Sequence, residues 1–135
     1  MLSENFHFNN VVLVSGPVII NEGKVLLNKH GVSPLWKFPG GDITAGSGDL
    51  AGWAVKKVKE EMGLDVEIIK ALSPLAVWKD EETILLFHYL AKPLSKKIIP
   101  ADYVREWAWL DTNNLPEDCS ENVKMIIEEI KQDKN

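Results

Sequence analysis

The sequence predicts an α/β (α+β) domain in which a mixed β-sheet packs between helices. β-rich and helical segments alternate along the chain in the order ββ, helix, ββ(β), helix. With 45% hydrophobic and 26% charged residues, the composition is typical of a globular domain. The chain has 135 residues and shows no internal repeat or linker. We therefore expect one domain, 1–135, with a flexible N-terminus over 1–9.

The first elements are a predicted β-hairpin and a loop. Residues 11–30, VVLVSGPVIINEGKVLLNKH, contain two β-rich runs on either side of the turn sequence Asn-Glu-Gly. Residues 31–48 contain five glycines and two prolines, which indicates a loop, with one short strand around 36–38.

An amphipathic helix is predicted next, from about residue 48 to residue 62. Ser47 is expected to cap it, and Asp49 in the first turn suits the helix dipole. Gly63 fits the left-handed position that follows a helix end. The face predicted to be buried carries apolar residues every four positions, widened by two more: Leu50, Ala54, Val58 and Met62, with Ala51 and Val55.

The second half of the chain predicts a long hairpin, a strand and a helix. The β-rich runs 66–78 and 83–94 are joined by KDEE, and the first is interrupted near Pro74. Residues 104–111 form the strand, on which we expect Trp107 or Trp109 to face the core and the other to face solvent or a partner. The final helix follows Ser120 as its cap, with these residues facing inward: Val123, Ile126, Ile127 and Ile130.

Charge and composition exclude several classes of partner. The formal net charge of −5 disfavours binding to a nucleic-acid duplex, which needs clustered Lys and Arg, although a local pocket can still be basic. The longest apolar run, 11–14, is too short for a membrane span, and the N-terminus has no signal-peptide pattern. The single cysteine, Cys119, suits a reducing compartment. We expect a cytoplasmic protein without a membrane partner.

The candidate chemistry lies at the end of the first helix. At 100° per residue, Glu61 falls at the edge of the buried face and Glu60 on the open side, with Lys57 between them one turn earlier. Two adjacent carboxylates after a glycine-rich loop suit a hard cation such as Mg²⁺, which can neutralise a diphosphate and activate water. Taken alone, such a pair is more often an ordinary solvated helix face.

Three segments, LLNKHG, LWKFPGGDITAGSG and KKVKEEMGL, resemble the Nudix hydrolase family. The motif of that family reads G-x5-E-x7-R-E-U-x-E-E-x-G-U, where U is bulky and aliphatic. Gly41 matches its first glycine, and its end is matched by Val58, Glu60, Glu61, Gly63 and Leu64. GKVLLNKH and REWAWLDTNNLPED also resemble family segments, so the likeness covers about 16–130. It implies the Nudix α/β/α sandwich.

The motif is degenerate at four points. Its first glutamate falls on Ser47, the spacer after it has eight residues instead of seven, and its arginine falls on Lys56, which lacks the planar fork of guanidinium. The next glutamate, which joins the metal site in the family and is a candidate general base there, falls on Lys57. Three roles remain open for Lys57: pairing with the two glutamates, which we favour, binding a phosphate, or a cation–π contact with Trp53.

The resemblance implies a Mg²⁺- or Mn²⁺-dependent hydrolase that cleaves a nucleoside diphosphate linked to another group, weakened by the degenerate motif. The alternative is a catalytically silent Nudix domain that binds a nucleotide or a protein partner. A homodimer is compatible with the sequence. The expected metal ligands and catalytic residues are Glu60 and Glu61, with Gly41 as a further metal ligand. The expected substrate-binding residues are Lys57, Lys56, His30, Trp36 and Phe38, although the two aromatic residues also suit sheet packing. Candidates for an extra acid are Asp80, Glu81, Glu82, Asp102 and Glu106.

Overall fold

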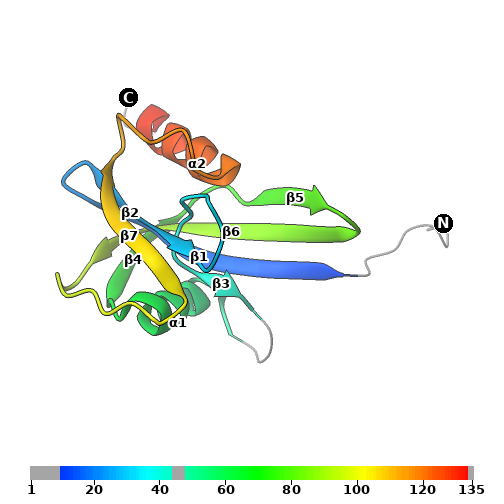
Figure 1. The fold of residues 1–135 in the computed structure, drawn as a ribbon, viewed down its shortest axis with the longest axis horizontal. Coiled ribbons are helices and arrows are strands. Elements are labelled where there is room, and N and C mark those ends of the chain that lie inside the picture. Colours follow the sequence, from blue (N-terminus) through cyan, green and yellow to red (C-terminus); the bar gives the residue numbers. More distant parts are fainter. Residues whose placement is uncertain (1–9, 44–47, 134–135) are drawn as a thin grey trace.

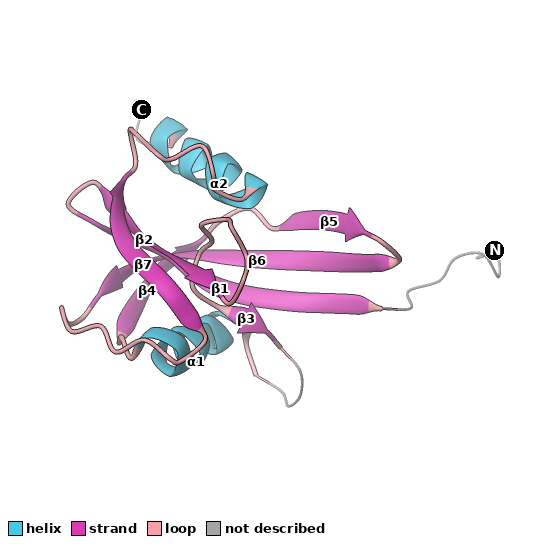
Figure 2. Ribbon diagram, in the orientation of Figure 1, coloured by secondary structure: helices cyan, strands magenta, loops and turns pink. Residues whose placement is uncertain are grey.

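The computed structural model describes residues 10–43 and 48–133, which form a seven-stranded sheet and two helices (Figures 1 and 2). The elements are β1 (Val11–Asn21), β2 (Lys24–His30), β3 (Gly41–Asp42), α1 (Leu50–Met62), β4 (Val66–Ala71), β5 (Leu75–Lys79), β6 (Glu82–Pro93), β7 (Val104–Asp111) and α2 (Glu121–Gln132). Their order confirms the predicted alternation of strand and helix segments.

The sheet is mixed, as predicted. Its main strand order is β4-β6-β1-β2-β7, with β3 paired to β1 and β5 paired to β6. β1 and β6 run parallel, from the pair Val11 and Thr83 to the pair Ile19 and Ala91, whereas the other pairs are antiparallel. The other five strands therefore extend outward from the central pair of β1 and β6.

One helix covers each face of the sheet, which gives the α/β/α sandwich (Figure 1). Side chains of neighbouring strand residues point to opposite faces, so Leu26 packs with α1 and Leu27 packs with α2. The core on the α1 face is Ile19, Leu26, Val58, Met62, Leu64, Val66, Ala91 and Val104. The core on the α2 face includes Val18, Val25, Leu27, Trp36, Phe38 and the four predicted inward residues of α2. In the part of the chain that the structure describes, neither helix has the length and apolarity needed to cross a membrane.

The two predicted hairpins are confirmed in detail. Glu22 and Gly23 connect β1 to β2 with φ angles of 54° and 77°. Two successive positive φ angles are what a two-residue turn between right-twisted strands requires, and glycine adopts them without strain. Around Pro74, β4 ends at Ala71 and β5 begins at Leu75, so the interruption lies where it was expected.

Three expectations differ from the structure. Asp49 is the cap of α1, because its Oδ1 accepts the backbone N–H of Gly52 at 2.5 Å, and the predicted cap Ser47 lies outside the described residues. Residues 36–38 make two isolated bridges, and the short strand is β3 instead. Trp109 packs on the core and Trp107 is 39% exposed, as predicted, but they do not lie on opposite faces: they are two residues apart on β7, so both lie on the α1 face, opposite Leu26 and Asn28.

A contact between two glycines holds the glycine-rich loop against β1. A Cβ atom added to Gly16 would lie 2.4 Å from the Pro39 carbonyl oxygen, and one added to Gly40 would lie 2.7 Å from the Gly16 Cα. Gly40 also has a φ angle of 138°, which other residues rarely adopt. The backbone of the loop can therefore approach the central strand only because both positions lack side chains.

We predict that Gly16→Ala lowers the free energy of unfolding by about 1–3 kcal/mol, because the added methyl group meets backbone that cannot rotate away. Denaturant unfolding measures this change. Gly41→Ala is the matched control, since its Cβ would meet only the flexible Lys57 side chain at 3.7 Å. Equal stability of the two variants would contradict the close-approach argument.

His88 ties β6 to the start of α2 inside the core on the α2 face. It is 4% exposed, its Nδ1 lies 3.3 Å from the Ser73 carbonyl oxygen, and its Nε2 lies 3.1 Å from the Asn122 amide nitrogen. A neutral ring with the proton on Nδ1 donates to the carbonyl and accepts from the amide. Burial lowers the pKa of His88, and this outweighs the opposite effects of the Ser73 hydrogen bond and the Glu129 charge. His88 is therefore a packed residue of the core on the α2 face.

Because the pKa of His88 is lowered on folding, the unfolded chain binds the proton first, and the contribution of the neutral ring is lost as pH falls below about 6.5. We predict that stability falls between pH 7.5 and 5.5 more steeply in the wild type than in His88→Gln, which has no titrating ring. Urea unfolding at several pH values measures both slopes, and parallel slopes would contradict the assignment.

Candidate active site

Glu61, in the last turn of α1, is the buried centre of the candidate site. Glu61 is only 2% exposed to solvent. Its Oε1 accepts a hydrogen bond from the Asn28 side-chain amide on β2 at 2.6 Å, and the backbone N–H of Gly40 in the glycine-rich loop approaches it at 3.4 Å. A buried carboxylate needs such donors to offset its lost hydration. Glu61 thereby fixes the helix end, the second strand and the glycine-rich loop to one another.

The segment after β6 closes the end of α1 and brings Tyr103 to the site. The backbone N–H groups of Ile99 and Ala101 donate to the last-turn carbonyls of Met62 and Glu61 at 2.7 and 2.8 Å. Gly63 has the left-handed conformation predicted for it, with φ of 65°. Because helix ends leave carbonyl groups without partners, these bonds cap α1 and set the position of the residues that follow.

Tyr103 approaches Glu61 from the outer side. Its hydroxyl lies 3.4 Å from Glu61 Oε2 and can donate to it. Desolvation, and then the negative charge of Glu61, raise the pKa of Tyr103, so the phenol keeps its proton at neutral pH. The Tyr103 ring also meets the His30 ring edge-on, with centroids 5.4 Å apart.

His30, at the end of β2, is the predicted substrate-binding residue that lies nearest to Glu61. Its Nε2 is 3.0 Å from Glu61 Oε1, yet this buried nitrogen has no hydrogen-bond partner, because the ring N–H direction is not aligned with the oxygen. The imidazole of His30 therefore lies directly beside the buried carboxylate.

Glu60 and Lys57 lie on the open side of α1. Glu60 is exposed, and Lys57 is half-buried with its stem beside Gly41. Within the described residues, no carboxylate comes within 4.0 Å of Lys57 Nζ, so the favoured pairing of Lys57 with Glu60 and Glu61 is wrong. Its ammonium lies 6.0 Å from the centroid of the Trp53 ring, whereas that of Lys56 lies at 4.7 Å. The cation–π contact is therefore made mainly by Lys56.

Trp36 and Phe38 pack in the core. Both are 9% exposed in the cluster under α2, and the Lys29 ammonium covers the Trp36 ring at 4.7 Å. Their positions agree with the sheet packing that the sequence also suggested for them, and neither ring is open to a ligand.

The five candidate extra acids lie in different places. Asp80, Glu81 and Glu82 are at the tip of the β5–β6 hairpin, where Thr83 pairs with Val11. That tip is five residues, or about 17 Å, along β1 from Gly16, which contacts the glycine-rich loop. Glu106 lies 3.9 Å from Lys29. Asp102 is exposed between Ala101, whose N–H donates to the backbone carbonyl of Glu61, and Tyr103, whose hydroxyl approaches Glu61 Oε2, so it is the candidate acid whose chain neighbours contact the site.

The sequence did not single out three groups of the site: Asn28, the backbone N–H of Gly40, and Tyr103. Asn28 carried a usable signal, since a polar residue follows three aliphatic residues in a strand that is otherwise buried. Tyr103 carried none, because the approach of its loop to α1 depends on tertiary contacts.

The carboxylate oxygens of this site suit a divalent cation that also binds an oxygen of the ligand. Over residues 10–43 and 48–133, no three His, Cys, Asp or Glu side chains gather into a metal cluster. Glu60 is exposed and has no ion pair there, while Glu61 is already engaged through Oε1. Mg²⁺ commonly takes one or two carboxylates and completes its shell with water and phosphate oxygens. The residues therefore fit an ion bound together with a phosphate, opposed by the positive charge of Lys57.

Comparisons with known proteins agree with this architecture. A MutT NUDIX hydrolase from Burkholderia pseudomallei has a TM-score of 0.80 at 21% identity, covering 90% of this chain and 99% of that one. A MutT protein from Methanosarcina mazei Go1 has a TM-score of 0.82 at 15% identity, covering 93% and 96%. An ADP-ribose pyrophosphatase from Streptococcus suis has a TM-score of 0.69 at 23% identity, covering 89% and 92%. No curated protein matches. A family model described as NUDIX domain matches residues 11–128, and the chain therefore belongs to the NUDIX domain family.

Proposed function

We propose that this chain hydrolyses a nucleoside diphosphate linked to another group, slowly, at the site between the end of α1 and the glycine-rich loop. The observation that carries the proposal is the buried carboxylate of Glu61, held against the Gly40 N–H, with the exposed carboxylate of Glu60 beside it. A solved relative is described as an ADP-ribose pyrophosphatase, which supports this substrate class. On its single cysteine, we also propose the cytoplasm as the compartment.

Nudix hydrolases generally use divalent metal ions. Here Glu60 would be the main ligand, together with Glu61 and the Gly41 carbonyl, and the ion would be Mg²⁺ or Mn²⁺. When bound, such an ion neutralises diphosphate charge and lowers the pKa of a bound water. The exposed position of Glu60 leaves its carboxylate free for this role.

The residues of the chain divide the remaining work. Glu61 positions the helix end against the glycine-rich loop through Asn28 and Gly40. Lys57 lies beside Gly41 with no carboxylate partner among the described residues, so its ammonium can bind a substrate phosphate. Asp102, on the loop that contacts Glu61, is our choice for the carboxylate that orients the attacking water and takes its proton.

In the proposed reaction, the water oxygen forms a bond to one phosphorus atom of the diphosphate. The bond from that phosphorus to the bridging oxygen breaks, and the bridging oxygen leaves with the second phosphate group. Two monophosphates result. Although Lys57 can hold the substrate, it slows the reaction, because its positive charge lies close to where the cation would bind and weakens binding of the cation.

A second candidate function is binding of the same ligand without turnover. The ammonium of Lys57, which has no carboxylate partner within residues 10–43 and 48–133, favours it, since a phosphate can then be held without a metal. In this reading Lys57 takes over the charge neutralisation that the ion would supply.

The experiment is a panel of nucleoside diphosphate derivatives incubated with the protein and Mg²⁺ or Mn²⁺, with monophosphate products measured by chromatography. We expect slow product formation that stops on chelation of the metal. Asp102→Asn should lower the rate below that of the wild type. The control Glu106→Gln should leave the rate unchanged, because Glu106 lies beside Lys29 and is not assigned to the reaction. Saturable binding of the panel by calorimetry, without any product, would reject hydrolysis in favour of the second candidate.

A further inference from the structure

A cavity lies at the opposite end of β2 from the candidate active site. It has a volume of about 260 Å³ and is lined by Asn21, Glu22, Lys24, Pro93, Ser95, Lys96 and Trp109. β2 runs seven residues from Lys24, at this cavity, to His30, at the active site, so the two places are about 20 Å apart. The cavity is therefore separate from the groups to which the proposed reaction is assigned.

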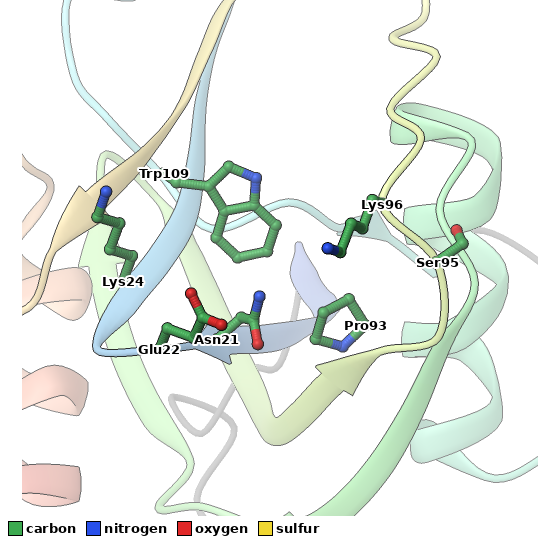
Figure 3. A pocket seen from close by; sticks show the side chains of 7 residues that line it. All are labelled: Asn21, Glu22, Lys24, Pro93, Ser95, Lys96 and Trp109. Carbon is green, nitrogen blue, oxygen red and sulfur yellow. The ribbon is translucent and has the colours of Figure 1, made fainter.

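An indole ring forms one wall of this cavity. Trp109 is half-buried, and it packs on the core of the α1 face across from Leu26. Figure 3 shows its ring between the side chains of Lys24 and Lys96, with that of Lys96 directed toward the cavity and Pro93 on the far side. A fixed indole next to a proline offers an apolar slot for a flat ring.

The charge of the cavity is positive although the chain as a whole has a formal net charge of −5. Lys24 and Lys96 line it, against a single acid, Glu22. Among the described residues, neither lysine has a carboxylate within 4.0 Å, whereas the nearby Lys92 is paired with Glu67 at 3.0 Å. An aromatic wall with a lysine on each side, neither of them ion-paired within residues 10–43 and 48–133, favours a ligand that combines a ring with an anion.

We propose that this cavity binds a nucleoside monophosphate, with its base against Trp109 and its phosphate at the ammonium group of Lys96, while Lys24 adds positive charge from the other side of the indole (Figure 3). The volume is below the roughly 300–1,000 Å³ of pockets that enclose a drug-sized ligand, so a mononucleotide is held with part of its surface exposed. Binding is accordingly weak, and it does not depend on whether the chain hydrolyses diphosphates.

The test is an NMR titration of the wild-type protein with AMP, followed through the indole N–H signal of Trp109. We expect a saturable shift in the millimolar range. Lys24→Gln/Lys96→Gln should weaken binding roughly tenfold, because the phosphate loses its contact with Lys96 and the nearby positive charge of Lys24. The matched control Lys79→Gln/Lys124→Gln removes the same charge from exposed positions away from the cavity and should bind as the wild type does.

Ligand fragments separate the two parts of the proposal. Adenosine lacks the phosphate and ribose 5-phosphate lacks the base, so each should bind at least about fivefold more weakly than AMP. Lys57→Gln, at the active site, should leave the Trp109 shift unchanged. The proposal is overturned if AMP leaves the Trp109 signal in place, if the Lys24/Lys96 variant titrates like the control, or if the shift disappears in Lys57→Gln.

Discussion

Glu60→Gln is expected to lower hydrolysis of the best substrate by roughly 10²-fold or more, because it removes the exposed carboxylate that would hold the cation. Glu60 has no ion pair in the described part of the chain, so the substitution breaks no contact that supports the fold. The effect should therefore appear in turnover, while the unfolding midpoint stays close to that of the wild type. Initial rates at saturating metal and substrate measure it.

Glu117→Gln is the control for this loss. Glu117 is also exposed and without an ion pair there, but it lies near the start of α2, on the other face of the sheet. Its rate should equal that of the wild type. If Glu60→Gln retains full activity, Glu60 is a solvated helix residue and the site assignment fails.

Lys57→Glu is expected to raise turnover by about 10- to 100-fold. The substitution replaces a positive charge beside Gly41 with a carboxylate one turn before Glu60, which restores the residue that the family motif has at this position. The added ligand should also lower the concentration of Mn²⁺ needed for half-maximal rate. Rates measured over a metal titration report both changes.

Lys59→Glu separates a local effect from a general change in charge. It makes the same change in net charge on the same helix, but Lys59 pairs with Asp65 at 3.2 Å, beyond the last turn of α1. Its turnover should not rise. An equal rise in both variants would indicate a general electrostatic effect, and no rise in either would show that Lys57 is not what limits the site.

Much of the fold could be predicted because its determinants are local. The β-rich runs of β1 and β2, the turn at Gly23 and the glycine after α1 are each encoded in a few consecutive residues. The prediction that Trp107 and Trp109 lie on opposite faces of β7 misapplied the strand period. Residues two apart in a strand share a face, so both tryptophans lie on the same face of the sheet. The cap of α1 was missed because two good capping residues, Ser47 and Asp49, stand close together.

The candidate site was predictable only in outline. The motif placed Glu61 and Glu60 at the helix end, next to the glycine-rich loop, as the structure has them. It could not show that Glu61 is held by Asn28, because a strand-to-helix contact spans 33 residues of sequence. The pairing expected for Lys57 was wrong because its side chain contacts residues that helix geometry alone does not include: its stem lies beside Gly41, and its ammonium lies near the Trp53 ring.

The central claim is that water attacks a diphosphate at this site, and isotope transfer tests it most directly. Wild-type protein in excess over a substrate from the panel is incubated with Mn²⁺ in water enriched in ¹⁸O, and the products are analysed by mass spectrometry. The account predicts one ¹⁸O atom in one of the two monophosphates, formed slowly by the wild type and faster by Lys57→Glu. Substrate that stays intact with both proteins, while calorimetry shows it bound, would contradict hydrolysis.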